Sequence, residues 1–259
     1  MFILKNWIKF NYSKIFISVL CLLIGVNIFA TVTDRELLLQ CVKPLVIPVF
    51  ILFYFIRCNY INWYLITYLV TAFLADFTSI FFDSPEILHY SNLFYLISYL
   101  SLLGLVLTQF KGIKFGLFLG SYLLVVFIIN TYLLYQLYTV LDGIIKDPIM
   151  VMFFGLHTVT LIILAFVSFA VYLNSDTKST IQYLVMSLCF IFSEVLFYIH
   201  NYYIYDWTLV LLERVLYSGG LIFLFNYMVT KNKAKKRAQK IRSYNFVFTK
   251  QQEQNAIKQ

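Results

Sequence analysis

The run FLADFTSIFF, residues 73–82, is apolar apart from two hydroxyl side chains and one carboxylate, Asp76. An ionised side chain is costly to bury, so an acid within a long apolar segment requires an explanation. Apolar runs recur throughout the 259 residues, of which 20% are aromatic and only 12% charged, and the mean hydropathy is +0.82. Soluble domains carry about 25% charged residues. The composition therefore predicts an integral membrane protein.

Eight segments are long and apolar enough to cross a bilayer, which takes about 20 residues of helix. The connections between them are short, so consecutive helices are expected to be antiparallel. We predict an all-α bundle of eight transmembrane helices within residues 1–230. The expected helices occupy residues 14–32, 38–56, 61–83, 89–109, 113–136, 149–173, 180–200 and 206–229.

The basic residues are divided unevenly between the two ends of this bundle. The N-terminus, alternate connections and the C-terminal tail hold most of the 20 Lys and Arg, whereas the other connections hold Arg35, Lys146 and most of the acids. Because Lys and Arg are enriched in cytoplasmic segments, both termini are predicted to be cytoplasmic, in a bacterial plasma (inner) membrane. The tail, residues 231–259, is expected to be a disordered basic segment, or alternatively one that binds a partner or anionic lipid.

Composition also excludes several kinds of site. The four cysteines form no CxxC pair and no zinc-type cluster with histidine, so we expect buried thiols and neither metal nor disulfide. They are Cys21, Cys41, Cys58 and Cys189. No cofactor is expected either. Much of the net charge of +8 lies in the tail, so this charge does not indicate nucleic-acid binding.

Charged residues inside the predicted spans are the candidate functional residues. Each costs at least about 2.5–3.5 kcal/mol at the bilayer centre on insertion scales, so these side chains should face the bundle interior and find partners. Counted from the outer ends of their helices, four of them and His157 lie on the order of 10 Å deep. These four are Lys43, Asp76, Glu194 and Arg214. The common depth predicts a polar cavity that opens toward the outer leaflet.

The eighth helix contributes further polar groups at this level. Glu213, Tyr217 and Gly220 share one face, whereas Glu213 and Arg214 are about 100° apart and are expected to contact different neighbours. Tyrosines 95, 99 and 217 could line the cavity. The alternative is that these residues form two buried ion pairs, Lys43 with Asp76 and Arg214 with Glu194. Such pairs would hold helices together and have no catalytic role.

Four stretches resemble the YhhN-like family of lysoplasmalogenases in order and spacing. CVKPLVIP (41–48) is similar to the Lys-Pro segment of that family's second helix, and AFLADFTSI (72–80) to the third-helix pattern that ends in Gly-Asp. CFIFSEVLFYIHNYYI (189–204) resembles the apolar-Ser-Asp segment of the seventh helix, and ERVLYSGGLIFL (213–224) the Tyr-containing last helix. Ala75 replaces the family's Gly, Glu194 an Asp and Ser98 a His, and Gly220 or Gly219 stands where the family has Gln.

The resemblance implies a membrane enzyme that hydrolyses the vinyl ether bond of a lysophospholipid to a fatty aldehyde and a glycerophospho-alcohol. It assigns the catalytic pair to Asp76 and Glu194, while Lys43, Arg214, His157 and Tyr217 would bind the substrate. Such a reaction needs one carboxyl group to deliver a proton to carbon and a second to steady the oxocarbenium ion and orient water, as in glycosidases. A non-catalytic lipid-binding or sensory protein and a small transporter are the alternatives.

Overall fold

The structure is a computed structural model that describes residues 2–33, 36–58, 62–79, 85–108, 117–145, 147–175, 177–204 and 206–257. The all-α prediction is confirmed, because these ranges contain eight helices and no strand. The helices are α1 (Phe2–Val32), α2 (Glu36–Arg57), α3 (Trp63–Thr78), α4 (Pro85–Leu107), α5 (Leu117–Ile144), α6 (Pro148–Asn174), α7 (Lys178–Tyr202) and α8 (Trp207–Ile257). Each overlaps one of the eight segments expected from the sequence.

Local sequence explains where several helices begin. The side chains of Asn62 and Asp147 accept hydrogen bonds from the N–H groups of Tyr64 and Ile149, and so cap α3 and α6. Thr177 forms a capping box with Thr180 at the start of α7. These side chains satisfy N–H groups that have no partner within the helix.

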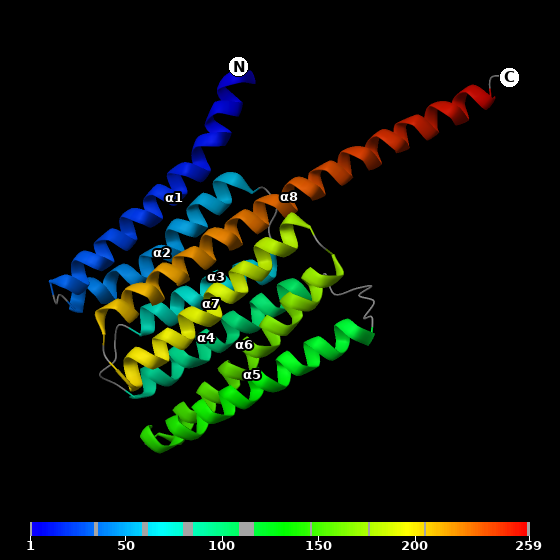
Figure 1. Ribbon diagram of the computed structural model, residues 1–259. Helices are drawn as coiled ribbons and strands as arrows, with labels where there is room; N and C mark the ends of the chain where they lie inside the picture. The colour runs from blue at the N-terminus through cyan, green and yellow to red at the C-terminus, as the bar shows by residue number, and fades with distance from the viewer. Residues whose placement is uncertain are drawn as a thin grey trace.

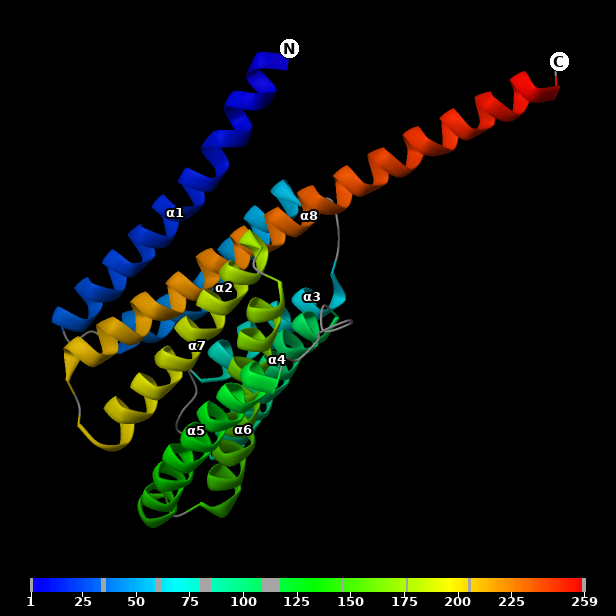
Figure 2. The same cartoon turned by 45° about the vertical axis from the view of Figure 1, so that its right-hand side comes forward.

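The helices form an elongated bundle in which α8, α7, α4 and α6 occupy the middle (Figure 1). The most extensive contacts join α7 to α8 and α3 to α4, and α4 also packs on α6. Helices α1 and α5 lie at opposite edges, and both chain ends project from the same end of the bundle (Figure 2). This arrangement gathers residues from α3, α4, α6, α7 and α8 around one interior space.

Four helical segments are long and apolar enough to cross a membrane, which indicates a membrane protein. They are Ile87–Leu107, Pro148–Asn174, Lys178–Tyr202 and Trp207–Arg237, and three apolar helical segments among the described residues are shorter. Large apolar side chains also cover the outer surface, for example Leu124, Ile128 and Tyr132 on α5, each more than half exposed. An apolar surface of this kind suits contact with lipid rather than with water.

The structure describes residues 231–257 of the tail as a continuation of α8, which ends at Ile257. Lys, Arg, Ala and Gln favour helix, and no Gly or Pro follows Gly220, so nothing in the tail stops a helix that has already formed. The cysteines were expected to be buried, but only Cys58 is; Cys21 and Cys41 are exposed on the apolar outer surface.

Candidate functional site: a cavity lined by three carboxylates

A small cavity of about 50 Å³ lies in the interior, between the second half of α3, the first halves of α4, α6 and α8, and the second half of α7. Three carboxylates line it, Asp76, Glu194 and Glu213, together with His157 and Tyr217. All five residues were singled out from the sequence, and the fold brings them together. The cavity has room for a few water molecules but not for a lipid chain.

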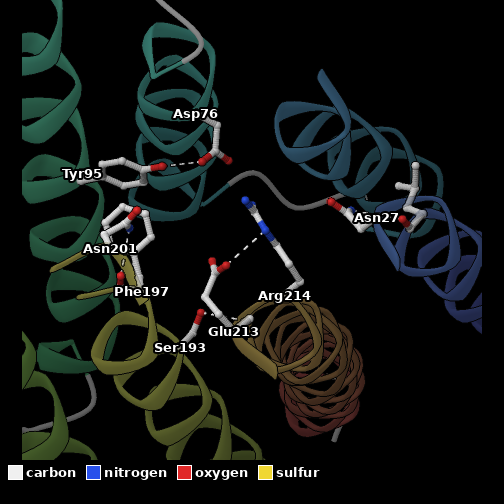
Figure 3. Close-up of polar contacts among 9 residues, drawn as sticks. Asn27, Asp76, Tyr95, Ser193, Phe197, Asn201, Glu213 and Arg214 are labelled. Carbon is white, nitrogen blue, oxygen red and sulfur yellow. Dashed lines mark hydrogen bonds and ion pairs between the residues drawn. The ribbon is translucent and has the colours of Figure 1, made fainter. Parts of the chain in front are cut away.

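Asp76 lies near the end of α3 and is 1% exposed. The phenol of Tyr95 on α4 donates a hydrogen bond of 2.5 Å to its Oδ1 (Figure 3). The hydroxyl of Ser91, one turn earlier on α4, donates to the backbone carbonyl of Ala75 at 2.9 Å. Two contacts between α3 and α4 therefore fix the position of this acid.

Glu194 on α7 is held in the same way by the same neighbouring helix. The phenol of Tyr99, one turn after Tyr95 on α4, donates a hydrogen bond of 2.6 Å to its Oε1. The preceding residue, Ser193, donates at 3.1 Å to the carbonyl of Glu213 and so ties α7 to α8. Helix α4 thus positions both acids of the predicted catalytic pair.

Because Glu213 and Arg214 are separated by about 100° around the helix, we expected them to contact different neighbours. Instead, they contact each other. The Nε of Arg214 lies 3.1 Å from Oε2 of Glu213, and both side chains are largely buried. Both side chains rise from α8, and the guanidinium of Arg214 extends from α8 toward the helix that carries Asp76 (Figure 3). The predicted pair of Arg214 with Glu194 is therefore absent from the described residues.

Arg214 retains donor capacity after this contact. Its Nη1 is buried and has no hydrogen-bond partner among the described residues. Arg214 is not among the residues that line the cavity, although its partner Glu213 is.

His157 and Tyr217 complete the wall of the cavity. The ring of His157 packs against Tyr99 with centroids 4.7 Å apart, and its Nδ1 lies 3.4 Å from the hydroxyl of Tyr198. Its Nε2 is buried without a partner among the described side chains. Tyr217 packs against Phe190 at 5.8 Å. His157 is thus a buried imidazole with one nitrogen available to a ligand or to water.

Lys43 lies on α2, directly before Pro44. Its side chain is outside the described part of the structure, so neither its expected pairing with Asp76 nor its substrate-binding role is tested.

A larger groove of about 250 Å³ adjoins the cavity and shares four lining residues with it. The shared residues are Leu88, Asn92, Phe197 and Tyr198. Beyond them the groove is lined mainly by apolar and amide side chains of α6 and α7, such as Met150, Phe154 and Asn201. Separately, Nε2 of His89 lies 2.6 Å from Oδ2 of Asp147, and this contact joins the starts of α4 and α6.

The sequence analysis missed several residues that define the site. Ser91 and Tyr198 were not considered, and Tyr95 and Tyr99 were only possible cavity residues. A signal was present on α4, where Ser91, Tyr95, Ser98 and Tyr99 fall on one face at helical spacing within an otherwise apolar segment. Such a polar stripe indicates a face directed at other polar groups.

Two of the positions at which the sequence departs from the YhhN-like pattern, Ser98 and Gly220, are closely packed. The hydroxyl of Ser98 is buried and bonded to the carbonyl of Tyr95. At Gly220 a Cβ atom would lie 2.6 Å from Cε1 of Phe190, whereas at Gly219 nothing lies within 4 Å of such an atom. Of the two candidate positions for the family's Gln, only Gly219 therefore has space for a side chain.

Comparison of the chain with protein-family models, with curated proteins and with solved structures finds no match.

Proposed function

We propose that this protein is a membrane-embedded lipid hydrolase of lysoplasmalogenase type, which cleaves the vinyl ether bond of a lysophospholipid. One observation carries the proposal: Asp76 and Glu194 line a single cavity, and each accepts a hydrogen bond from a phenol of α4. Two carboxyl groups at one water-sized cavity match the division of roles in glycosidases, where one acts as the acid and the other as base or nucleophile.

In the proposed reaction one of the two carboxyl groups protonates the β-carbon of the vinyl ether and leaves an oxocarbenium ion. The other carboxylate stabilises this cation and orients a water molecule, which adds to the carbon attached to oxygen. The resulting hemiacetal breaks down to the aldehyde and the free alcohol. The phenols of Tyr95 and Tyr99 keep the two carboxyl groups in position, because a positioned acid contributes only when its geometry is fixed.

The lipid itself would occupy the adjoining groove. Its volume of about 250 Å³ and its apolar wall suit part of an alkyl chain, and the four shared residues connect it to the acids. In this proposal Arg214, with its spare donors, and Lys43 bind the phosphate, and His157 and Tyr217 contact the reacting end of the substrate. Arginine suits this role because its planar fork matches phosphate oxygens.

We further propose that all eight helices cross a bacterial plasma membrane, with both termini in the cytoplasm. The uneven distribution of Lys and Arg supports this orientation, and the two chain ends lie at the same end of the bundle. Reporter fusions after Arg57 and after Asp206 should then report opposite sides of the membrane.

The direct test is aldehyde release from a lysoplasmalogen by the purified full-length protein. Asp76→Asn and Glu194→Gln should each reduce the rate by about 10²–10⁴-fold, the contribution of a positioned acid or base. Asp142→Asn, which neutralises an exposed carboxylate of α5, is the matched control and should retain activity. Absence of release, or release unaffected by both site substitutions, would disprove the catalytic proposal, and a lipid that co-purifies without turnover would favour a lipid-binding protein.

A further inference from the structure

A second cavity, of about 340 Å³, lies at the other end of the bundle from the carboxylates. It is formed where α2 and α4 end, where α3 begins and where α8 leaves the bundle (Figure 1). Its lining residues are Tyr54, Asn62, Trp63, Tyr64, Thr108, Met228, Lys231, Asn232 and Lys235. The proposed hydrolysis uses none of them.

The charge of this cavity is positive. Lys231 and Lys235 both line it, one turn apart on α8, and no carboxylate is among the described residues around it. Like charges at this spacing repel each other within a helix. An anion bound at the cavity would reduce the repulsion between these two neighbouring charges.

Lys231 is held in place rather than extended into solvent. Its Nζ donates a hydrogen bond of 3.2 Å to the hydroxyl of Tyr227 and lies 5.4 Å from the centroid of that ring. The side chain is half-buried, and it forms no ion pair with a described residue. A partly desolvated ammonium group without a counter-ion is costly, so its charge is available to an anionic ligand.

The neutral residues that line this cavity also suit an anionic ligand. Asn62, Asn232 and Tyr64 supply amide and hydroxyl groups that can donate to phosphate oxygens. Trp63 is 78% exposed and Tyr64 48% exposed beside them. Trp and Tyr concentrate at the level of lipid headgroups, so these two exposed side chains favour a cavity at the depth of the lipid phosphates.

We propose that this cavity is a binding site for a phosphate-bearing anion, held by Lys231 and Lys235 at the end of the bundle opposite the carboxylates. The phosphate can belong to the headgroup of an anionic membrane lipid or to a soluble phosphate compound. This site is independent of the proposed hydrolysis, because it shares no residue with the carboxylate cavity.

The test uses the full-length protein in detergent, with native mass spectrometry to measure binding of added phosphatidylglycerol and thermal unfolding to measure binding of inorganic phosphate. The variant K231Q/K235Q removes both charges from the cavity. The matched control is K233Q/K236Q, which removes two exposed charges from the same part of α8 but none from the cavity. A third variant, K231R/K235R, keeps the charges and should keep binding.

The expected result is a loss of affinity of roughly tenfold or more in K231Q/K235Q alone, as expected for a lost charge-assisted hydrogen bond. If phosphatidylglycerol binding shows this loss, the ligand is a lipid headgroup; if the thermal shift with inorganic phosphate shows it, the ligand is a soluble phosphate. Equal losses in both glutamine variants would mean nonspecific attraction and would overturn the proposal. Failure of the wild-type protein to bind either probe would overturn it too.

Discussion

Tyr95 and Tyr99 lie one turn apart on α4 and donate hydrogen bonds to carboxylates on two different helices. Tyr95 bonds Asp76 on α3, and Tyr99 bonds Glu194 on α7, at 2.5 Å and 2.6 Å. One face of α4 therefore sets the positions of both acids. The two acids are 118 positions apart in the chain. Local sequence therefore does not bring them together; the packing of α3 and α7 on α4 does.

Removal of either phenol hydroxyl should destabilise the protein. A hydrogen bond contributes about 0.5–3 kcal/mol, most when one partner is charged, so Tyr95→Phe and Tyr99→Phe should each lower the free energy of unfolding by an amount in that range. Denaturant titration in detergent measures this change. Tyr90→Phe, which alters an exposed tyrosine on the same helix, should have almost no effect. Losses as small as that control in both variants would show that the phenols do not hold the acids.

Gly220 and Gly219 offer a matched pair on α8. Phe190, against which a Cβ at Gly220 would collide, is fully buried and packs on the rings of Tyr68, Tyr99 and Tyr217. Because this ring has little room to move, Gly220→Ala should cost about 1–3 kcal/mol of stability. Gly219→Ala should be neutral or stabilising by about 0.5–1 kcal/mol, since alanine favours helix. Equal thermal midpoints for the two variants would contradict the packing described for α7 and α8.

Sequence patterns predicted the all-α class, the approximate positions of eight helices and five residues that line the carboxylate cavity. These features follow from local information, because apolar length defines a helix and a charge within it must face inward. The contact of Tyr99 with Glu194 depends instead on which helices pack together, and no local pattern in either helix specifies that. The register of α4 against α3 and α7 is a tertiary property of this kind.

The incorrect prediction of the ion-pair partner of Arg214 has a different cause. Backbone geometry separates Glu213 and Arg214 by about 100°, which led us to expect different neighbours. Arginine has a long side chain with several rotatable bonds, so its guanidinium can reach a carboxylate that its Cβ does not face. The helical continuation of α8 to Ile257 was not predicted, although the Lys, Arg, Ala and Gln residues of this segment are good helix formers.

The buried pair of Glu213 and Arg214 should be costly to break from one side. Arg214→Met leaves the carboxylate of Glu213, in a residue only 4% exposed, without its ion-pair partner, and should destabilise the protein by about 3–5 kcal/mol. The double variant Glu213→Gln/Arg214→Met removes both charges and should recover much of that loss. A double-mutant cycle of unfolding free energies measures the coupling. If the double variant is no more stable than Arg214→Met alone, the pair contributes no coupling and this account of its energetics is wrong.

The contact between His89 and Asp147 predicts an acid-dependent loss of stability. The hydrogen bond with His89, together with the N–H of Ile149, holds the pKa of the Asp147 carboxyl below its ordinary value of 3.8. Because the folded pKa is the lower one, the contact stabilises the protein fully above the ordinary pKa, and this stability is lost as the pH falls through the folded value. Thermal midpoints in detergent, measured from neutral pH down to about pH 3, should therefore fall more steeply below pH 4 in wild type than in Asp147→Asn.

Asn is a good N-cap residue, so Asp147→Asn retains the cap of α6 while it removes the titrating charge. Asp142→Asn neutralises an exposed acid near the end of α5, five residues before Asp147, and should leave the part of the curve below pH 4 unchanged. A curve for Asp147→Asn that coincides with wild type down to the lowest pH would show that the contact of Asp147 with His89 does not contribute to stability. If Asp142→Asn instead flattened the curve equally, general charge repulsion at this end of the bundle would explain the acid sensitivity.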